Sequence, residues 1–222
     1  MTQPSGSRLP SPISLPGLAA VCMVAAILTT VASRPLGVSL GVTGTVVAIA
    51  VLWVIAIVEV TAWRRVAPTR TLGITGLGLS DAMIAMAAGL VLAIAVPLLS
   101  VGAARFTGYA TGTVETAAQL NVEIAILGVV TAAVTEEIIY RAAAMCALSA
   151  LRAPTAVVLL VPALLFTLTH WSWGLAHMTF VVFPLSLALG ALFLWRRSLP
   201  LNIIAHLIAD LPVIVLAAIA SA

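Results

Sequence analysis

Charged side chains are scarce in this chain of 222 residues, and lysine is missing altogether. Asp, Glu, Lys and Arg make up 8% of the residues, against about 25% in an ordinary soluble domain. The hydrophobic fraction is 63%, and the mean hydropathy is +1.24. A soluble globular domain is excluded because no soluble fold could hide so much apolar surface, and the composition indicates an integral membrane protein.

Cysteine is almost as rare, and the basic residues are dispersed. Cys22 and Cys146 both fall in apolar runs without CxxC spacing, so neither a disulfide framework nor a zinc knuckle is indicated. The ten Arg residues do not form a basic stripe, so we expect no nucleic-acid partner. The absence of lysine is typical of a GC-rich bacterial genome, and the expected location is a bacterial cytoplasmic membrane.

The apolar runs predict an all-α, polytopic transmembrane bundle of about seven spans. We divide the chain into a disordered tail (1–16), N-terminal membrane helices without catalytic motifs (17–120) and a catalytic helical core (121–222). A signal peptide is the alternative interpretation of the first span. The predicted spans are 17–33, 36–61, 82–103, 121–150, 154–173, 177–195 and 200–221.

The arginines also predict how the chain is oriented, because cytoplasmic loops carry an excess of Arg and Lys. With seven spans and the N-terminus inside, only Arg34 and Arg105 fall outside. The C-terminus is then outside. The arginines placed inside are Arg8, Arg64, Arg65, Arg70, Arg152, Arg196 and Arg197.

Six ionisable side chains lie inside the predicted spans of the C-terminal half. Each charge at the bilayer centre costs roughly 2.5–3.5 kcal/mol on insertion scales, so several of them within three helices indicate a polar site enclosed by protein. The six are Glu136, Glu137, Arg141, His170, His206 and Asp210.

The fourth predicted span carries the two carboxylates. Glu137 and Arg141 are four residues apart, so they can pair on one face of a helix. That pairing leaves Glu136 as the less neutralised carboxylate and the candidate general base. The alternative is a structural clamp in which the acidic and basic residues only fix helix packing.

Two further spans carry histidines at helical spacing. Phe166 lies one turn before His170 and is expected to shield the imidazole from lipid. Asn202, His206 and Asp210 follow one another at intervals of four, forming a polar stripe that must face protein or water. A single histidine of this kind is usually structural, but two histidine helices beside a glutamate helix favour a site.

The remaining polar residues are given simpler roles. We expect His177 to lie at the membrane interface and Glu59 to pair with an arginine at the membrane edge. Ser80 or Asp81 is expected to cap the third span.

Three motifs in this order connect the chain to a family. They are EExxxR at 136–141, FxxxH at 166–170 and HxxxD at 206–210. Together they resemble the CPBP intramembrane proteases, which include the type II CAAX prenyl endopeptidases and bacterial bacteriocin-processing and immunity relatives. The resemblance covers about residues 121–215.

The resemblance implies an endopeptidase that cleaves a membrane-anchored or lipidated polypeptide within the bilayer. By analogy, Glu136 and His170 polarise a water, and His206 with Asp210 stabilises the oxyanion. Glu137 and Arg141 then hold Glu136 in register. A mechanism without a metal is favoured because the HExxH helix of zinc proteases is absent, and a zinc site made of one Glu and two His is the alternative.

Asp210 departs from the Asn that would suit an oxyanion site. Either its carboxyl is protonated and donates a hydrogen bond, or it orients His206. Two other functions stay open at this point: a proton-coupled transporter, and a non-catalytic protein that binds a membrane partner or confers immunity.

Overall fold

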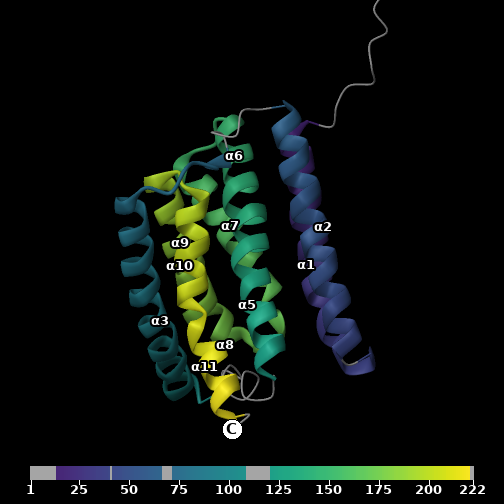
Figure 1. Ribbon diagram of the computed structural model, residues 1–222, viewed down its shortest axis with the longest axis vertical. Helices are drawn as coiled ribbons and strands as arrows, with labels where there is room; N and C mark the ends of the chain where they lie inside the picture. The colour runs from purple at the N-terminus through teal and green to yellow at the C-terminus, as the bar shows by residue number, and fades with distance from the viewer. Residues whose placement is uncertain (1–13, 41, 67–71, 109–120, 221–222) are drawn as a thin grey trace, which may run out of the picture.

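Helices make up all the regular secondary structure in the residues that the computed structural model describes, which are 14–40, 42–66, 72–108 and 121–220 (Figure 1). Most of the predicted tail lies outside these residues, and so does most of the segment between the third and fourth predicted spans, 104–120. The N-terminal half contains α1 (Leu15–Leu40), α2 (Val42–Val66) and α3 (Leu79–Thr107).

The C-terminal half consists of four helical runs, several of them changing their winding along their length. The first run is α5 (Val122–Glu136), the π-helical η2 (Glu137–Met145) and α6 (Cys146–Ala150), and the second is α7 (Thr155–Thr169) with the short η3 (Trp171–Trp173). The third is α8 (Leu175–His177), the π-helical η4 (Met178–Val182) and α9 (Phe183–Arg196), and the fourth is α10 (Leu199–Ala209) with α11 (Leu211–Ala220).

Five helices in the described residues are long and apolar enough to cross a membrane, which indicates an integral membrane protein and confirms the all-α class. These five correspond to five of the seven predicted spans. The predicted fifth span is represented by α7, a shorter apolar helix, and the predicted fourth span by the run that contains the glutamate pair. The five spans are Leu15–Ala32, Val42–Arg65, Leu79–Thr107, Leu175–Arg196 and Leu199–Ala220.

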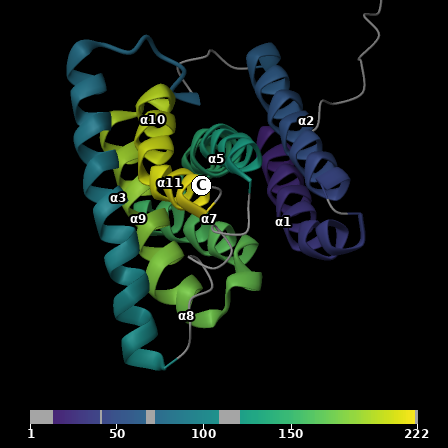
Figure 2. The same cartoon turned by 60° about the horizontal axis from the view of Figure 1, so that its bottom comes forward.

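The run α5–η2–α6 lies in the middle of the bundle. The hairpin of α1 and α2 packs on one side of it, and α9, α10 and α3 lie on the other (Figures 1 and 2). A helix in this central place can bring its side chains to neighbours on both sides, which suits the segment with the most charged residues.

Capping residues and prolines explain where the helices of the C-terminal half begin and break. The side chain of Asn121 accepts a hydrogen bond from the backbone N–H of Ile124 and caps α5, and Ser198 caps α10 in the same way. Pro184 and Pro212 lack the N–H that a regular helix needs. The π-helical turns of η4 come just before Pro184. The helix α10 ends at Ala209, and Asp210 separates it from α11, which contains Pro212.

Two local predictions in the N-terminal half are wrong. The helix α1 continues through Arg34 and Pro35 to Leu40 instead of ending there. The N-cap of α3 is Gly78, one residue before the helix, so neither Ser80 nor Asp81 caps it. Asp81 instead accepts a hydrogen bond from Nε of Arg196, 115 residues away, at 3.0 Å.

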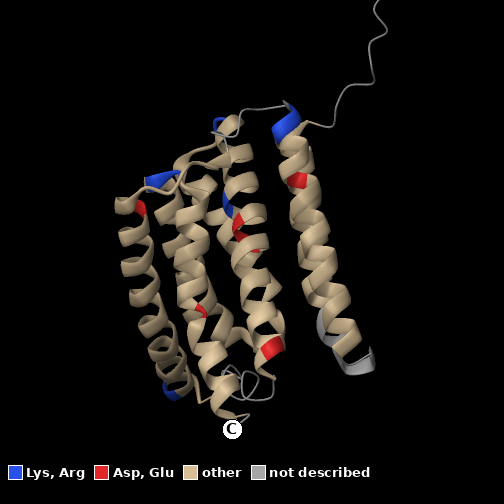
Figure 3. Cartoon of the chain, in the orientation of Figure 1, with Lys and Arg blue, Asp and Glu red and all other residues tan. Residues whose placement is uncertain are grey.

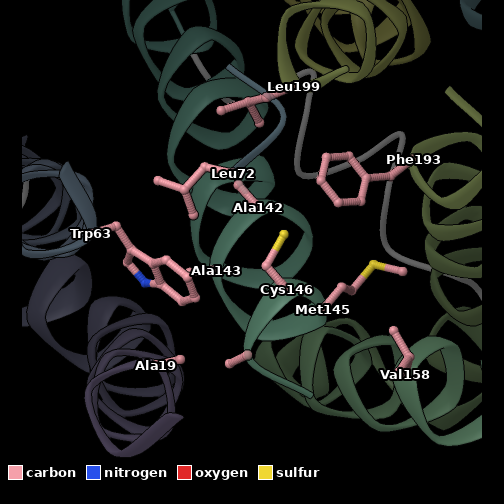
Figure 4. Packing of buried hydrophobic residues seen from close by; sticks show 11 residues of the cluster. Ala19, Trp63, Leu72, Ala142, Ala143, Met145, Cys146, Val158, Phe193 and Leu199 are labelled. Atoms are coloured by element: carbon pink, nitrogen blue, oxygen red, sulfur yellow. The ribbon is translucent and has the colours of Figure 1, made fainter. Parts of the chain in front are cut away.

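A tight apolar core surrounds η2 and α6. Figure 4 shows Trp63 and Ala19 on one side of this run and Phe193 and Val158 on the other. The residues of η2 that face them are mostly alanines, and Ala142–Ala144 are fully buried. Small side chains let the neighbouring helices approach the run closely and fix its position.

The charged residues are distributed unevenly along the bundle. Most of the arginines whose positions are described lie at the end of the molecule where α2 and α9 terminate (Figure 3). The outward faces of the long helices are apolar instead: Leu98, for example, is 66% exposed and Ile219 is 70% exposed. Exposed apolar side chains on long helices are what contact with lipid requires.

Candidate active site

The predicted polar residues meet at a cavity of about 230 Å³. It extends along α5 from Glu136 towards the beginning of that helix, away from the arginine-rich end of the bundle. Most of its walls are apolar. The polar and aromatic side chains that line it are Glu136, Phe166, His170, Trp173, His177, His206 and Asp210.

Glu137 is the anchor of the polar cluster. Its carboxylate is completely buried and forms an ion pair with Nη1 of Arg141 at 3.1 Å. It also accepts hydrogen bonds from Nδ1 of His206 at 2.9 Å and from Nδ2 of Asn202 at 3.0 Å. The predicted pair with Arg141 is therefore confirmed. Two of the three partners come from α10, so Glu137 ties that helix to η2. A buried carboxylate with this many partners is fixed in place.

Glu136 has a different environment, although it is the adjacent residue. Its side chain lines the cavity and is 13% exposed, and its Oε2 lies 3.9 Å from Nε2 of His206. The change from α5 to the wider η2 occurs between the two glutamates. One carboxylate is therefore held by protein, while the other is presented to the cavity.

His206 lies among three carboxylates. Because the carboxylate of Glu137 is an acceptor, the Nδ1 of His206 donates to it. Nε2 of the same ring lies 3.5 Å from Oδ2 of Asp210 and 3.9 Å from Glu136. This arrangement favours an imidazolium with its second N–H directed to the acidic groups of the cavity.

His170 follows the last residue of α7 and is oriented by local contacts. Its Nδ1 lies 2.9 Å from Oγ1 of Thr169 and 3.3 Å from the carbonyl oxygen of Phe166. The hydroxyl of Thr169 donates to that same carbonyl, so its lone pairs are free to accept from Nδ1–H. In this tautomer Nε2 of His170 is a hydrogen-bond acceptor.

Phe166 packs against His170, His206 and Arg141. Its ring centroid is 5.0 Å from that of His170 and 6.3 Å from that of His206. The guanidinium of Arg141 lies over the same ring at 4.5 Å, and Tyr140 meets it edge-on. The predicted contact with His170 is confirmed, and Phe166 also joins it to the other polar residues.

His177 and Trp173 also belong to the cavity, which sequence reasoning missed. His177 was expected at the membrane interface, but only 4% of it is exposed and it stacks on Trp173 at 5.0 Å. Trp173 in turn meets His170 edge-on at 6.4 Å. Residues 170–177 do not form one helix, because η3 ends before Gly174 and α8 begins after it, so helical spacing in the sequence does not predict this arrangement.

The expected pairing of Glu59 is wrong. Its side chain is completely buried in α2, and neither carboxylate oxygen has a hydrogen-bond partner among the described residues. Glu123 is exposed at the start of α5.

The geometry of the polar residues does not fit a metal site. In the part of the chain that is described, no three His, Cys, Asp or Glu side chains are arranged to hold a metal ion. The zinc alternative gains no support from this arrangement.

The sequence matches a family model described as Type II CAAX prenyl endopeptidase Rce1-like over residues 118–212. No curated protein and no solved structure matches the chain significantly. The matched segment includes all the site residues predicted from the motifs, which are Glu136, Glu137, Arg141, Phe166, His170, Asn202, His206 and Asp210.

Proposed function

Because residues 118–212 form an Rce1-like domain of the type II CAAX prenyl endopeptidase family, we propose that the chain is an intramembrane endopeptidase. It hydrolyses a peptide bond of a membrane-associated or lipidated polypeptide. The observation that carries this proposal is that Glu136, His170 and His206, from three separate helical runs, line one cavity. A carboxylate and two imidazoles within an apolar enclosure are suited to activating a water and stabilising the charge that its attack creates.

Glu136 is the general base. It takes one proton from a water held between its carboxylate and the acceptor Nε2 of His170. The resulting hydroxide adds to the carbonyl carbon of the substrate. The carboxyl of Glu136 then gives the proton to the nitrogen of the breaking C–N bond, so that an acid and an amine leave the site. The location of Glu136 on the cavity wall supports this role.

His206 stabilises the oxyanion. With Nδ1–H bound to Glu137, its Nε2–H is the donor available to the carbonyl oxygen as negative charge develops. Asp210 acts on this imidazole: the 3.5 Å distance from its Oδ2 to Nε2 supports orientation of His206 over direct donation to the oxyanion. Glu137, Arg141 and Asn202 hold the imidazole in position.

Reconstitution of the purified chain in phosphatidylethanolamine and phosphatidylglycerol vesicles tests the proposal. The probes are peptides with one apolar membrane anchor and a randomised ten-residue segment, and mass spectrometry identifies the cleaved products. Glu136→Gln preserves the shape of the side chain but removes its basicity, so it should lower the cleavage rate roughly 10²–10⁴-fold.

Glu123→Gln is the matched control, since it makes the same change at an exposed position of the same helix. It should cleave as the unmodified protein does. Equal rates for Glu136→Gln and Glu123→Gln would contradict the proposal, and so would the absence of cleavage by the unmodified protein.

A further inference from the structure

The cavity follows one face of α5 outward from the glutamate. The lining residues of this helix recur at intervals of three and four, which places them on one face. From Ile124 to Glu136 this face is about 18 Å long at ~1.5 Å per residue. An extended polypeptide can therefore lie along it. The α5 residues that line the cavity are Ile124, Ala125, Gly128, Val129, Ala132 and Glu136.

Gly128 lies about one third of the way along this face from Ile124, and helix packing does not require a glycine there. A Cβ added to Gly128 would meet no described atom within 4 Å. By contrast, a Cβ at Gly89 would come within 2.6 Å of Ile208, and one at Gly190 within 2.7 Å of Leu159. Glycine weakens a helix relative to alanine, so an open glycine on a cavity wall needs another explanation.

The distance from Gly128 to Glu136 corresponds to a definite place in a substrate. Eight residues of helix advance about 12 Å. An extended chain covers the same distance in three to four residues at ~3.3 Å each. When the scissile bond of a substrate lies at Glu136, the substrate residue three or four positions from that bond therefore lies beside Gly128.

The surroundings indicate what kind of side chain would be accepted there. Apolar side chains from α3, η4, α9 and α11 complete the cavity wall. These apolar residues are Val96, Val181, Val182, Leu185 and Val213. The ionisable His206 and Asp210 lie close to Glu136, with Nε2 of His206 3.9 Å from Glu136 and 3.5 Å from Asp210.

We propose that Gly128 forms the floor of a substrate-binding subsite that accepts a bulky apolar side chain three or four residues from the cleaved bond. This inference rests on the proposed endopeptidase function. The missing side chain leaves the room that a leucine or an aromatic residue of the substrate occupies. A larger residue at position 128 would fill that room from the protein side.

Gly128→Leu and Gly102→Leu form a matched pair that tests the subsite. Both glycines lie within long helices, and an added Cβ meets nothing within 4 Å at either, but only Gly128 lines the cavity. Each variant is incubated in vesicles with the anchored peptide library described above. Gly128→Leu should cleave peptides with a bulky apolar residue at the third or fourth position at least tenfold more slowly, while peptides with Gly or Ala there are cleaved at the original rate. Gly102→Leu should keep the original preference.

Gly128→Ala, which adds a single methyl group, should show an intermediate shift and guards against misfolding of the leucine variant. An unchanged preference in both Gly128 variants would overturn the subsite while leaving the protease function intact. An equal loss on all peptides would overturn it as well, since it would show a general obstruction. If the unmodified protein cleaves no peptide, the proposed function fails and the subsite falls with it.

Discussion

Nδ1 of His206 lies 2.9 Å from Oε1 of Glu137, a residue 69 positions earlier in the chain. This contact makes the second glutamate of the pair a support for the imidazole on α10. Glu136, by contrast, lines the cavity, and among the described residues its carboxylate comes no closer than 3.9 Å to the same ring. The two adjacent carboxylates therefore have different surroundings, and removing them is expected to have different consequences.

Glu137→Ala should destabilise the protein far more than Glu136→Ala. The first change leaves Arg141 buried without its carboxylate, and breaking a buried ion pair costs about 3–5 kcal/mol. The second removes a group that already faces the cavity and should change stability by less than about 1 kcal/mol. Thermal unfolding in detergent measures both. Similar unfolding temperatures for the two variants would show that Glu137 is not the anchor.

Phe166→Leu should impair cleavage more than stability. The ring packs on His170 and beneath Arg141, and a cation–π contact of this kind contributes about 0.5–2 kcal/mol. Leucine keeps the apolar volume but removes the flat surface that orients His170. We expect a rate reduction of about 10-fold or more, with the unfolding temperature only slightly lowered. Full activity in Phe166→Leu would argue against an orienting role.

Gly89→Ala should reduce both stability and activity. The new methyl group would lie 2.6 Å from Cβ of Ile208 and 2.9 Å from the carbonyl oxygen of Ala205. Such overpacking lowers the free energy of unfolding by about 1–3 kcal/mol. It should also displace α10, which carries His206. Gly102→Ala is the control on the same helix, since its Cβ meets nothing within 4 Å. Unfolding temperature and peptide cleavage, measured on both variants, should separate them clearly.

Cysteine labelling should show that the cavity lies towards the side of the membrane opposite the arginine-rich end of the bundle. We expect the arginine-rich end to be cytoplasmic, with the N-terminus inside and the C-terminus outside. In a background with Cys22 and Cys146 replaced by Ala, Val213→Cys should react with a membrane-impermeant maleimide added outside intact cells. Leu151→Cys, exposed beside Arg152, should react only after the membrane is opened. The reverse pattern would invert the proposed orientation.

The parts of the site that are local in sequence could be predicted. Glu137 with Arg141 and Phe166 with His170 are each four residues apart, and a helix brings such residues together whatever the rest of the fold does. The stripe from Asn202 to Asp210 could be expected to face protein because lipid offers it no partners. Which partner it meets could not be predicted, since Asn202 and His206 both contact Glu137 from a distant helix.

The errors arise where tertiary packing decides. Asp81 looks like a helix cap, but Arg196 comes within reach only because α3 and α9 lie in the same part of the bundle. His177 looks interfacial because it follows two tryptophans, yet the chain folds one of them, Trp173, back against His170 and carries His177 inward. Neither outcome is encoded in spacing along a single helix.

The wide winding of η2 has a consequence for how related chains should be aligned. A π-helical turn holds more residues than an α-helical one, and such segments amount to an extra residue inserted into a regular helix. Relatives that wind this helix regularly are therefore expected to lack one residue between the glutamate pair and Cys146. In an alignment, such relatives would show a gap of one position at this point. The gap would distinguish them from relatives whose two glutamates, like those of this chain, have different surroundings.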